Sequence, residues 1–166
     1  YHDKILTALG TDATNKIVLH VGGIYGDKEA ALDRFAENFQ RLPESVQNRL
    51  IIENDDRLYN SEEVLELTNR LQIPSVFDNL HHAINPPPSG GDDRYWIAAA
   101  AKTWKARDGK QKIHYSQQAP GKRPGAHTDT IQLDTFQQIY NQLDDPTIDI
   151  MLEVKDKNLS AIKCQN

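Results

Sequence analysis

The chain has 166 residues, 38% of them hydrophobic, a mean hydropathy of −0.66 and a net charge of −5. That length suits one domain with a buried core, and no apolar run approaches the roughly 18–20 residues of a membrane span. The negative net charge argues against a protein that binds nucleic acid through a large excess of positive charge. It does not exclude a nuclease, because bound metal ions would reverse the local field.

Hydrophobic periodicity predicts one α/β domain over residues 1–166. A helix opens the chain, and strands and helices then alternate, which implies a parallel sheet. The predicted strands cover residues 16–21, 50–52, 74–77, 110–116 and 148–152. The predicted helices cover residues 1–9, 28–40, 44–49, 61–71, 94–105 and 133–143. Helical units between five parallel strands are typical of part of a (β/α)8 TIM barrel.

Each predicted strand ends in a polar side chain that can bind a metal ion. In a barrel, the carboxyl ends of the strands meet at one site, so we expect these side chains to converge. The candidates in chain order are His20, Glu53, Asp78 with His81, Lys112 with His114, His127 from the following loop, and Glu153.

The single cysteine, Cys164, excludes an internal disulfide, and the pattern of the first residues leads us to expect no secretion signal. Both observations favour the cytoplasm. Imidazoles and carboxylates without thiolates fit Mn²⁺, Zn²⁺, Fe²⁺ or Mg²⁺. Seven candidate ligands are more than one ion needs, so we expect two or three ions, with Glu53 bridging two of them.

Single members of this set have simpler interpretations. Asp78 could be a helix cap, His82 is expected to be a bystander, and His2 is expected on the surface of a helix. Lys112 is either a solvated strand residue or a lysine that faces the metals. The glycines at 22–23 fit a tight turn, and Lys28 lacks the following Ser or Thr of a phosphate-binding P-loop.

Such metal clusters favour phosphodiester hydrolysis, in which one ion generates hydroxide and another takes charge on the leaving oxygen. Sugar isomerases also carry Glu, Asp and His on barrel strands, so a sugar isomerase or epimerase is the alternative. That alternative needs a carbohydrate pocket. The only candidates, Trp96 and Trp104, lie on a helical stripe typical of a core.

Several motifs together resemble the UV-damage endonucleases, over essentially the whole chain. The motifs are IVLHVGGIYGDK, LIIENDD, PSVFDNLHH, KIHYSQQ with the following GAH, and IDIMLEVKDK. The resemblance implies a TIM barrel related to the metal-dependent apurinic/apyrimidinic endonucleases, manganese as the ion, and incision of double-stranded DNA immediately 5′ to a photolesion, on the chromosome in the cytoplasm.

By motif, the resemblance assigns metal ligation to His20, Glu53, Asp78, His81, His114, His127 and Glu153. It gives Lys112 a secondary place in the site. We expect Glu53 and His114 to position the attacking group, and Lys112 to stabilise charge on the phosphate. Loops that carry Tyr25, Lys28, Gln117 and Arg123 are expected to contact the DNA backbone.

The family barrel has eight strands, and this chain begins at the helix before the fourth. The first three strands, which supply further metal-binding histidines and lesion-probing aromatic residues, are therefore expected to be absent. An open sheet has unpaired edges, so we expect the first strand to be covered, for example by a second copy of the chain. A third hypothesis is that the chain is a folded module without activity of its own, which weak Mn²⁺ binding would support.

Overall fold

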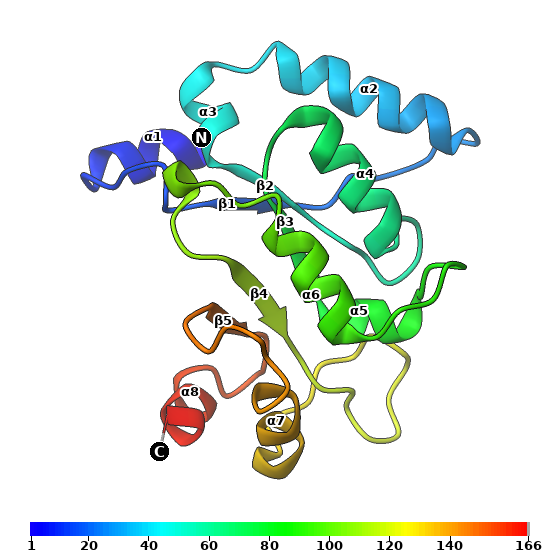
Figure 1. Cartoon of the computed structure of the whole chain (residues 1–166), viewed down its shortest axis with the longest axis vertical. Helices are drawn as coiled ribbons and strands as arrows, with labels where there is room; N and C mark the ends of the chain where they lie inside the picture. Colours follow the sequence, from blue (N-terminus) through cyan, green and yellow to red (C-terminus); the bar gives the residue numbers. More distant parts are fainter. Residues whose placement is uncertain (166) are drawn as a thin grey trace.

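The computed structural model describes residues 1–165, and its strands and helices alternate along the chain (Figure 1). The strands are β1 (Ile17–Leu19), β2 (Leu50–Glu53), β3 (Ser75–Asp78), β4 (Lys112–Tyr115) and β5 (Asp149–Leu152). The helices are α1 (His2–Ala8), α2 (Lys28–Gln40), α3 (Glu44–Arg49), α4 (Ser61–Leu71), α5 (Asn79–Ile84), α6 (Asp93–Ala101), the 3₁₀-helix η1 (Ala106–Asp108), α7 (Leu133–Tyr140) and α8 (Asn158–Gln165).

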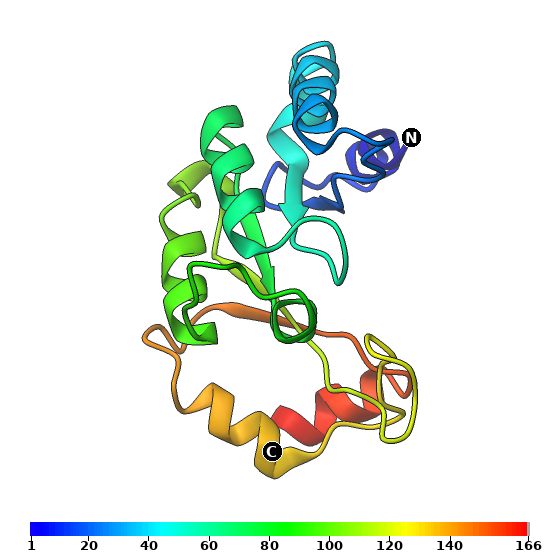
Figure 2. The same ribbon diagram turned by 90° about the vertical axis from the view of Figure 1, so that its right-hand side faces the viewer.

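The five strands form one parallel sheet in the order β1-β2-β3-β4-β5. The sheet curls into a half-barrel with the helices around it (Figure 2). Because all strands run in the same direction, their carboxyl ends share one edge of the sheet, and the residues that follow them are brought together there. The predicted partial barrel of five parallel strands is confirmed.

Apolar side chains hold the helices against the outer face of the sheet in three clusters. Leu50 and Ile52 of β2 pack with Val64 and Leu67 of α4 in the first. The second joins Phe77 and Ile113 of β3 and β4 to Trp96 and Ile97 of α6, and the third contains Tyr115, Ile131 and Val154. Side chains alternate along β4, so that Ile113 and Tyr115 face these cores and His114 lies on the opposite face.

Two α-helices, α5 and α8, and the short 3₁₀-helix η1 lie outside the predicted elements, and both α6 and α7 end earlier than predicted. Helix α5 begins directly after β3 because the Oδ1 of Asp78 accepts the N–H of His81 and so caps it. Helix α8 was not predicted because it follows the charged run at residues 155–157. Its Ser160 is fully buried. Helix α6 ends at Ala101 because the Thr103 hydroxyl donates to a carbonyl of its last turn and accepts the N–H of Ser75.

Strands β1 and β5 are the two edges of the sheet. Leu19 on β1 is 41% exposed, and Met151 on β5 is 59% exposed. Among the helices of residues 1–165, none combines the length and the apolar character that crossing a membrane requires.

Candidate metal centre

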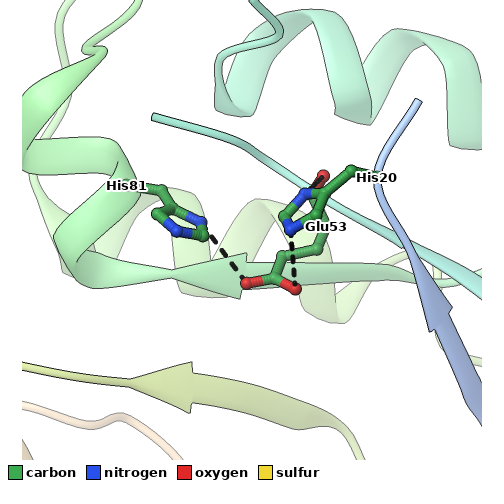
Figure 3. Close-up of side chains that lie close together, drawn as sticks. All are labelled: His20, Glu53 and His81. Atoms are coloured by element: carbon green, nitrogen blue, oxygen red, sulfur yellow. Dashed lines mark hydrogen bonds and ion pairs between the residues drawn. The ribbon is translucent and has the colours of Figure 1, made fainter. Parts of the chain in front are cut away.

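Glu53 lies at the centre of the site, at the carboxyl end of β2, and is 3% exposed. His20 directly follows β1, and His81 belongs to α5. Figure 3 shows the two imidazoles on either side of the Glu53 carboxylate. Oε2 of Glu53 is 3.7 Å from Nε2 of His20, and Oε1 is 3.4 Å from Nδ1 of His81. One ligand atom from each of the three lies within 4.8 Å of the others, a spacing that a single metal ion can bridge.

A second group shares Glu53 and extends toward β4 and β5. Glu53, Asp78, His114 and Glu153 also offer ligand atoms that all lie within 4.8 Å of one another. Nδ1 of His114 is 3.1 Å from Oε1 of Glu53 and 3.0 Å from Oε1 of Glu153. His127 joins at the rim, with its Nε2 3.7 Å from Oε2 of Glu153. Two adjacent groups with one carboxylate in common form a geometry suited to two neighbouring ions.

Three polar atoms at this centre are buried and make no hydrogen bond of acceptable geometry, although two of them lie within ion-pair distance of neighbouring members of the centre. They are Oε1 of Glu53, Oδ2 of Asp78 and Nδ1 of His114. Buried polar atoms nearly always have a partner, and a cation would satisfy all three together. All three are oxygen or imidazole ligands of the kind that divalent cations such as Mn²⁺ and Zn²⁺ accept, so the residues present fit a bound metal.

Backbone carbonyls orient two of the imidazoles. Nδ1 of His20 lies 3.3 Å from the carbonyl oxygen of Glu53, and Nδ1 of His81 lies 2.8 Å from the carbonyl oxygen of Asn54. A carbonyl can only accept, so each Nδ1 is the donor and each Nε2 is left free as a ligand.

The electrostatics of the centre follow from its close packing. Burial alone would raise the pKa of Glu53, but His114 and His81 lower it to about 2. Burial raises the pKa of Asp78 to about 6 against the effect of His81. Burial works against protonation of the two histidines, yet the carboxylates beside them raise the pKa of His81 to about 9 and that of His114 to about 10. The metal-free centre therefore holds protons where cations would bind.

Lys112 is not brought into this centre. It begins β4, and its ammonium group lies 3.2 Å from Oδ2 of Asp149 and over the ring of Trp104. Its role in the reaction therefore stays a prediction without a supporting contact.

The residues predicted to contact DNA differ in how free they are. Tyr25 is 88% exposed and has a φ of 51°, and Arg123 is also exposed. Lys28 instead pairs with Glu63, its Nζ lying 2.5 Å from Oε1. The amide of Gln117 binds the Tyr115 hydroxyl and the backbone of residue 132 at both of its polar groups. Tyr25 and Arg123 are thus exposed to a ligand, although the guanidinium of Arg34 lies 5.7 Å from the centre of the Tyr25 ring, whereas the other two are held by a salt bridge or hydrogen bonds.

The polar residues near the strand ends and on α1 that were not predicted as ligands lie outside the metal centre. His82 is buried, with Nδ1 3.2 Å from the Ser61 hydroxyl and Nε2 3.2 Å from the Gly91 carbonyl. His2 lies exposed on α1. Asp55, one of the acids after β2, accepts three backbone N–H groups of the turn that follows it. Asn54 stands directly after a predicted ligand, but no role was predicted for it from the sequence.

Fold and site together define an α/β half-barrel whose strand ends carry histidine–carboxylate clusters compatible with a divalent metal. Residues 1–165 match the family model described as UV-endonuclease UvdE, and the chain belongs to that family. The chain is 43% identical to a UV DNA damage endonuclease of Clostridium perfringens (strain 13 / Type A), covering all of this chain and 40% of that protein. It is 34% identical to a UV DNA damage endonuclease of Bacillus cereus (strain G9842), covering 98% of this chain and 51% of that one.

The fold comparison agrees with the family assignment. The crystal structure of SacUVDE superposes with a TM-score of 0.91 at 41% sequence identity, over 99% of this chain and 54% of that chain. The chain therefore spans about half the length of the relatives that it matches.

Proposed function

We propose that this chain supplies the greater part of the metal centre of a DNA-repair endonuclease that hydrolyses the phosphodiester 5′ to UV photolesions in double-stranded DNA. The observation that carries the proposal is the convergence of three carboxylates and three imidazoles from consecutive strand ends, with the carboxylate of Glu53 buried between the imidazoles. The UvdE family assignment supplies the substrate class. Such a substrate places the protein on the chromosome in the cytoplasm.

We assign metal ligation to His20, Glu53, Asp78, His81, His114, His127 and Glu153, for two or three divalent ions, with Mn²⁺ as the preferred ion. Bound ions of this kind activate water and take up negative charge on the leaving oxygen of a phosphodiester. Asp78 caps α5 with one oxygen while its other oxygen is buried without a hydrogen bond, so the helix that carries His81 is fixed by a neighbouring ligand. Glu53 holds three imidazoles in place and so sets the spacing of the two groups.

Tyr25 and Arg123 are proposed to contact the DNA backbone because both project from loops and are exposed. Lys28 and Gln117 would first have to leave Glu63 and the Tyr115 hydroxyl. Lys112 would have to leave Asp149 to stabilise charge on a phosphate oxygen.

Nicking of UV-irradiated plasmid by the full-length protein tests the proposal. With Mn²⁺ we expect nicks that map immediately 5′ to photolesions, and none after chelation of the metal. Unirradiated plasmid is the matched control. Equal nicking of both plasmids, or nicking that persists in EDTA, would refute the assignment.

The sugar isomerase alternative is not favoured. Trp96 is 4% exposed in the second core cluster, and the indole N–H of Trp104 donates to the Ser75 carbonyl. Both tryptophans are thus engaged in packing and hydrogen bonding within the fold. Ketose formation from a panel of aldoses, without any DNA cleavage, would reverse this preference.

Self-association through the open edges of the sheet is a separate proposal about the chain by itself. Beside β5 lies an apolar groove of about 1180 Å³, lined by residues that include Phe136, Tyr140 and Met151. Two copies could cover these edges by pairing β5 of one with β1 of the other. Light scattering of residues 1–166 should then give the mass of a dimer, and a monomer at high concentration would exclude this arrangement.

A further inference from the structure

Two asparagines follow acidic residues at the ends of neighbouring strands, as Glu53-Asn54 at β2 and Asp78-Asn79 at β3. Asn54 is 1% exposed, and both polar groups of its side chain are used. Its Oδ1 accepts the N–H of Asp78 at 2.9 Å, and its Nδ2 donates to the carbonyl oxygen of Asp78 at 3.1 Å. The side chain of Asn54 therefore bonds both the N–H and the carbonyl oxygen of Asp78, the next predicted ligand along the chain.

These two bonds continue the sheet beyond its last paired residues. The β2–β3 register ends where Glu53 faces Val76, two residues before Asp78. There the side-chain amide of Asn54 takes the place of a peptide group and offers one donor and one acceptor to the neighbouring strand. Asp78 is thereby fixed beside the other ligands, and its Oδ2 is buried without a hydrogen bond.

The backbone of Asn54 holds a second ligand. Its carbonyl oxygen accepts from Nδ1 of His81 at 2.8 Å, which orients the ring and leaves Nε2 free. Asn54 is also covalently next to Glu53. One residue, whose side-chain amide is fully used in hydrogen bonds, thus touches two ligands and adjoins a third.

We propose that Asn54 is a positioning residue of the metal centre, which sets the distance between Glu53, Asp78 and His81 through the pairing of its amide with the Asp78 backbone. This inference rests on the proposed function, since it assigns a task to Asn54 only if the centre binds metal. Asn54 makes no contact with a substrate. It acts through the ligands that it holds.

Asn79 provides a matched comparison in the same structure. Its Nδ2 donates to the carbonyl oxygen of Ser116 at 3.0 Å, and its Oδ1 accepts the N–H of Ser116 at 2.8 Å. The two asparagines therefore make the same pair of bonds between adjacent strands. Asn79 holds a serine beyond His114, whereas Asn54 holds a carboxylate ligand.

The experiment compares Asn54→Ala with Asn79→Ala in the full-length protein. Each variant loses the same pair of hydrogen bonds between adjacent strands, and the loss of thermal stability in chelated samples should be larger for the fully buried Asn54. Mn²⁺ affinity, measured by calorimetry at a temperature where both are folded, should fall about 10- to 100-fold for Asn54→Ala, as is typical when a partner of a metal ligand is removed. Asn79→Ala should weaken Mn²⁺ binding by no more than a few-fold.

If Asn54→Ala does not fold, Asn54→Ser keeps a smaller polar side chain and should still weaken Mn²⁺ binding more than Asn79→Ala does. Equal Mn²⁺ affinities for the Asn54 and Asn79 variants would overturn the positioning role and leave the proposed function standing. A parent protein that binds no Mn²⁺ would overturn both, and this is visible before any variant is made.

Discussion

Replacing Glu53 by glutamine keeps the shape of the side chain and removes the charge on which three imidazoles converge. The histidines lower the pKa of Glu53 from 4.5 to about 2. Each unit of pKa corresponds to about 1.36 kcal/mol, so these interactions contribute about 3 kcal/mol to the metal-free fold at pH 7. Because the pKa is depressed on folding, this stability is present above about pH 4.5 and is lost as the pH falls toward 2.

We therefore expect Glu53→Gln to lower the free energy of unfolding of the chelated protein by about 3 kcal/mol at pH 7. The difference from the parent should shrink below about pH 4.5. Mn²⁺ binding should weaken by at least about tenfold, because both metal-competent groups lose the carboxylate that they share. Nicking of irradiated plasmid should fall with it.

Urea denaturation in EDTA and calorimetric Mn²⁺ titration measure the two effects separately. Glu66→Gln makes the same chemical change at an exposed position of α4 and serves as the control. The reasoning is refuted if Glu53→Gln matches the Glu66→Gln control in stability, Mn²⁺ affinity and nicking.

Three further predictions concern protons, Lys112 and DNA. The metal-free protein holds protons on His81 and His114, whose pKa values are about 9 and 10. Mn²⁺ must displace both protons, so Mn²⁺ affinity should rise by up to about a hundredfold per pH unit near pH 7. A pH-independent Kd in calorimetry would contradict this. Lys112→Met should leave Mn²⁺ affinity unchanged in the same titration, whereas a weaker Kd would show that its amine reaches the centre. Fluorescence anisotropy at several salt concentrations tests the DNA contacts. Arg123→Ala should lower the slope of log affinity against log salt concentration by about one phosphate contact. Tyr25→Ala should weaken DNA binding and leave that slope unchanged.

The fold could be predicted because strand and helix patterns report local burial. Runs such as Leu50–Glu53 and Ser75–Asp78 are buried on both faces, as strands of a parallel sheet are, and their polar ends follow directly. Parallel strands then place those ends at one edge whatever the details of the loops. For this reason the order of strands and helices along the chain was enough to predict that Glu53, Asp78 and His114 converge.

The sequence could not show which side chains form hydrogen bonds or ion pairs with one another. Lys112 lies on the same face of β4 as His114. Its ammonium group nevertheless forms an ion pair with Asp149 on the neighbouring strand. Gln117 looked free in a polar loop, but its amide closes that loop onto residue 132. Asn54 was concealed for the same reason, since its partner is a backbone 24 residues away. The repeated pairing of an acid with an asparagine at two strand ends was the signal that could have revealed it.

The central claim is that the strand ends gather metal ions around Glu53. Anomalous diffraction at the manganese edge from crystals soaked in Mn²⁺ tests it most directly. The account predicts two peaks, one among Glu53, His20 and His81 and one among Glu53, Asp78, His114 and Glu153. Peaks at other surfaces, or an ordered centre without any anomalous signal at saturating Mn²⁺, would contradict it.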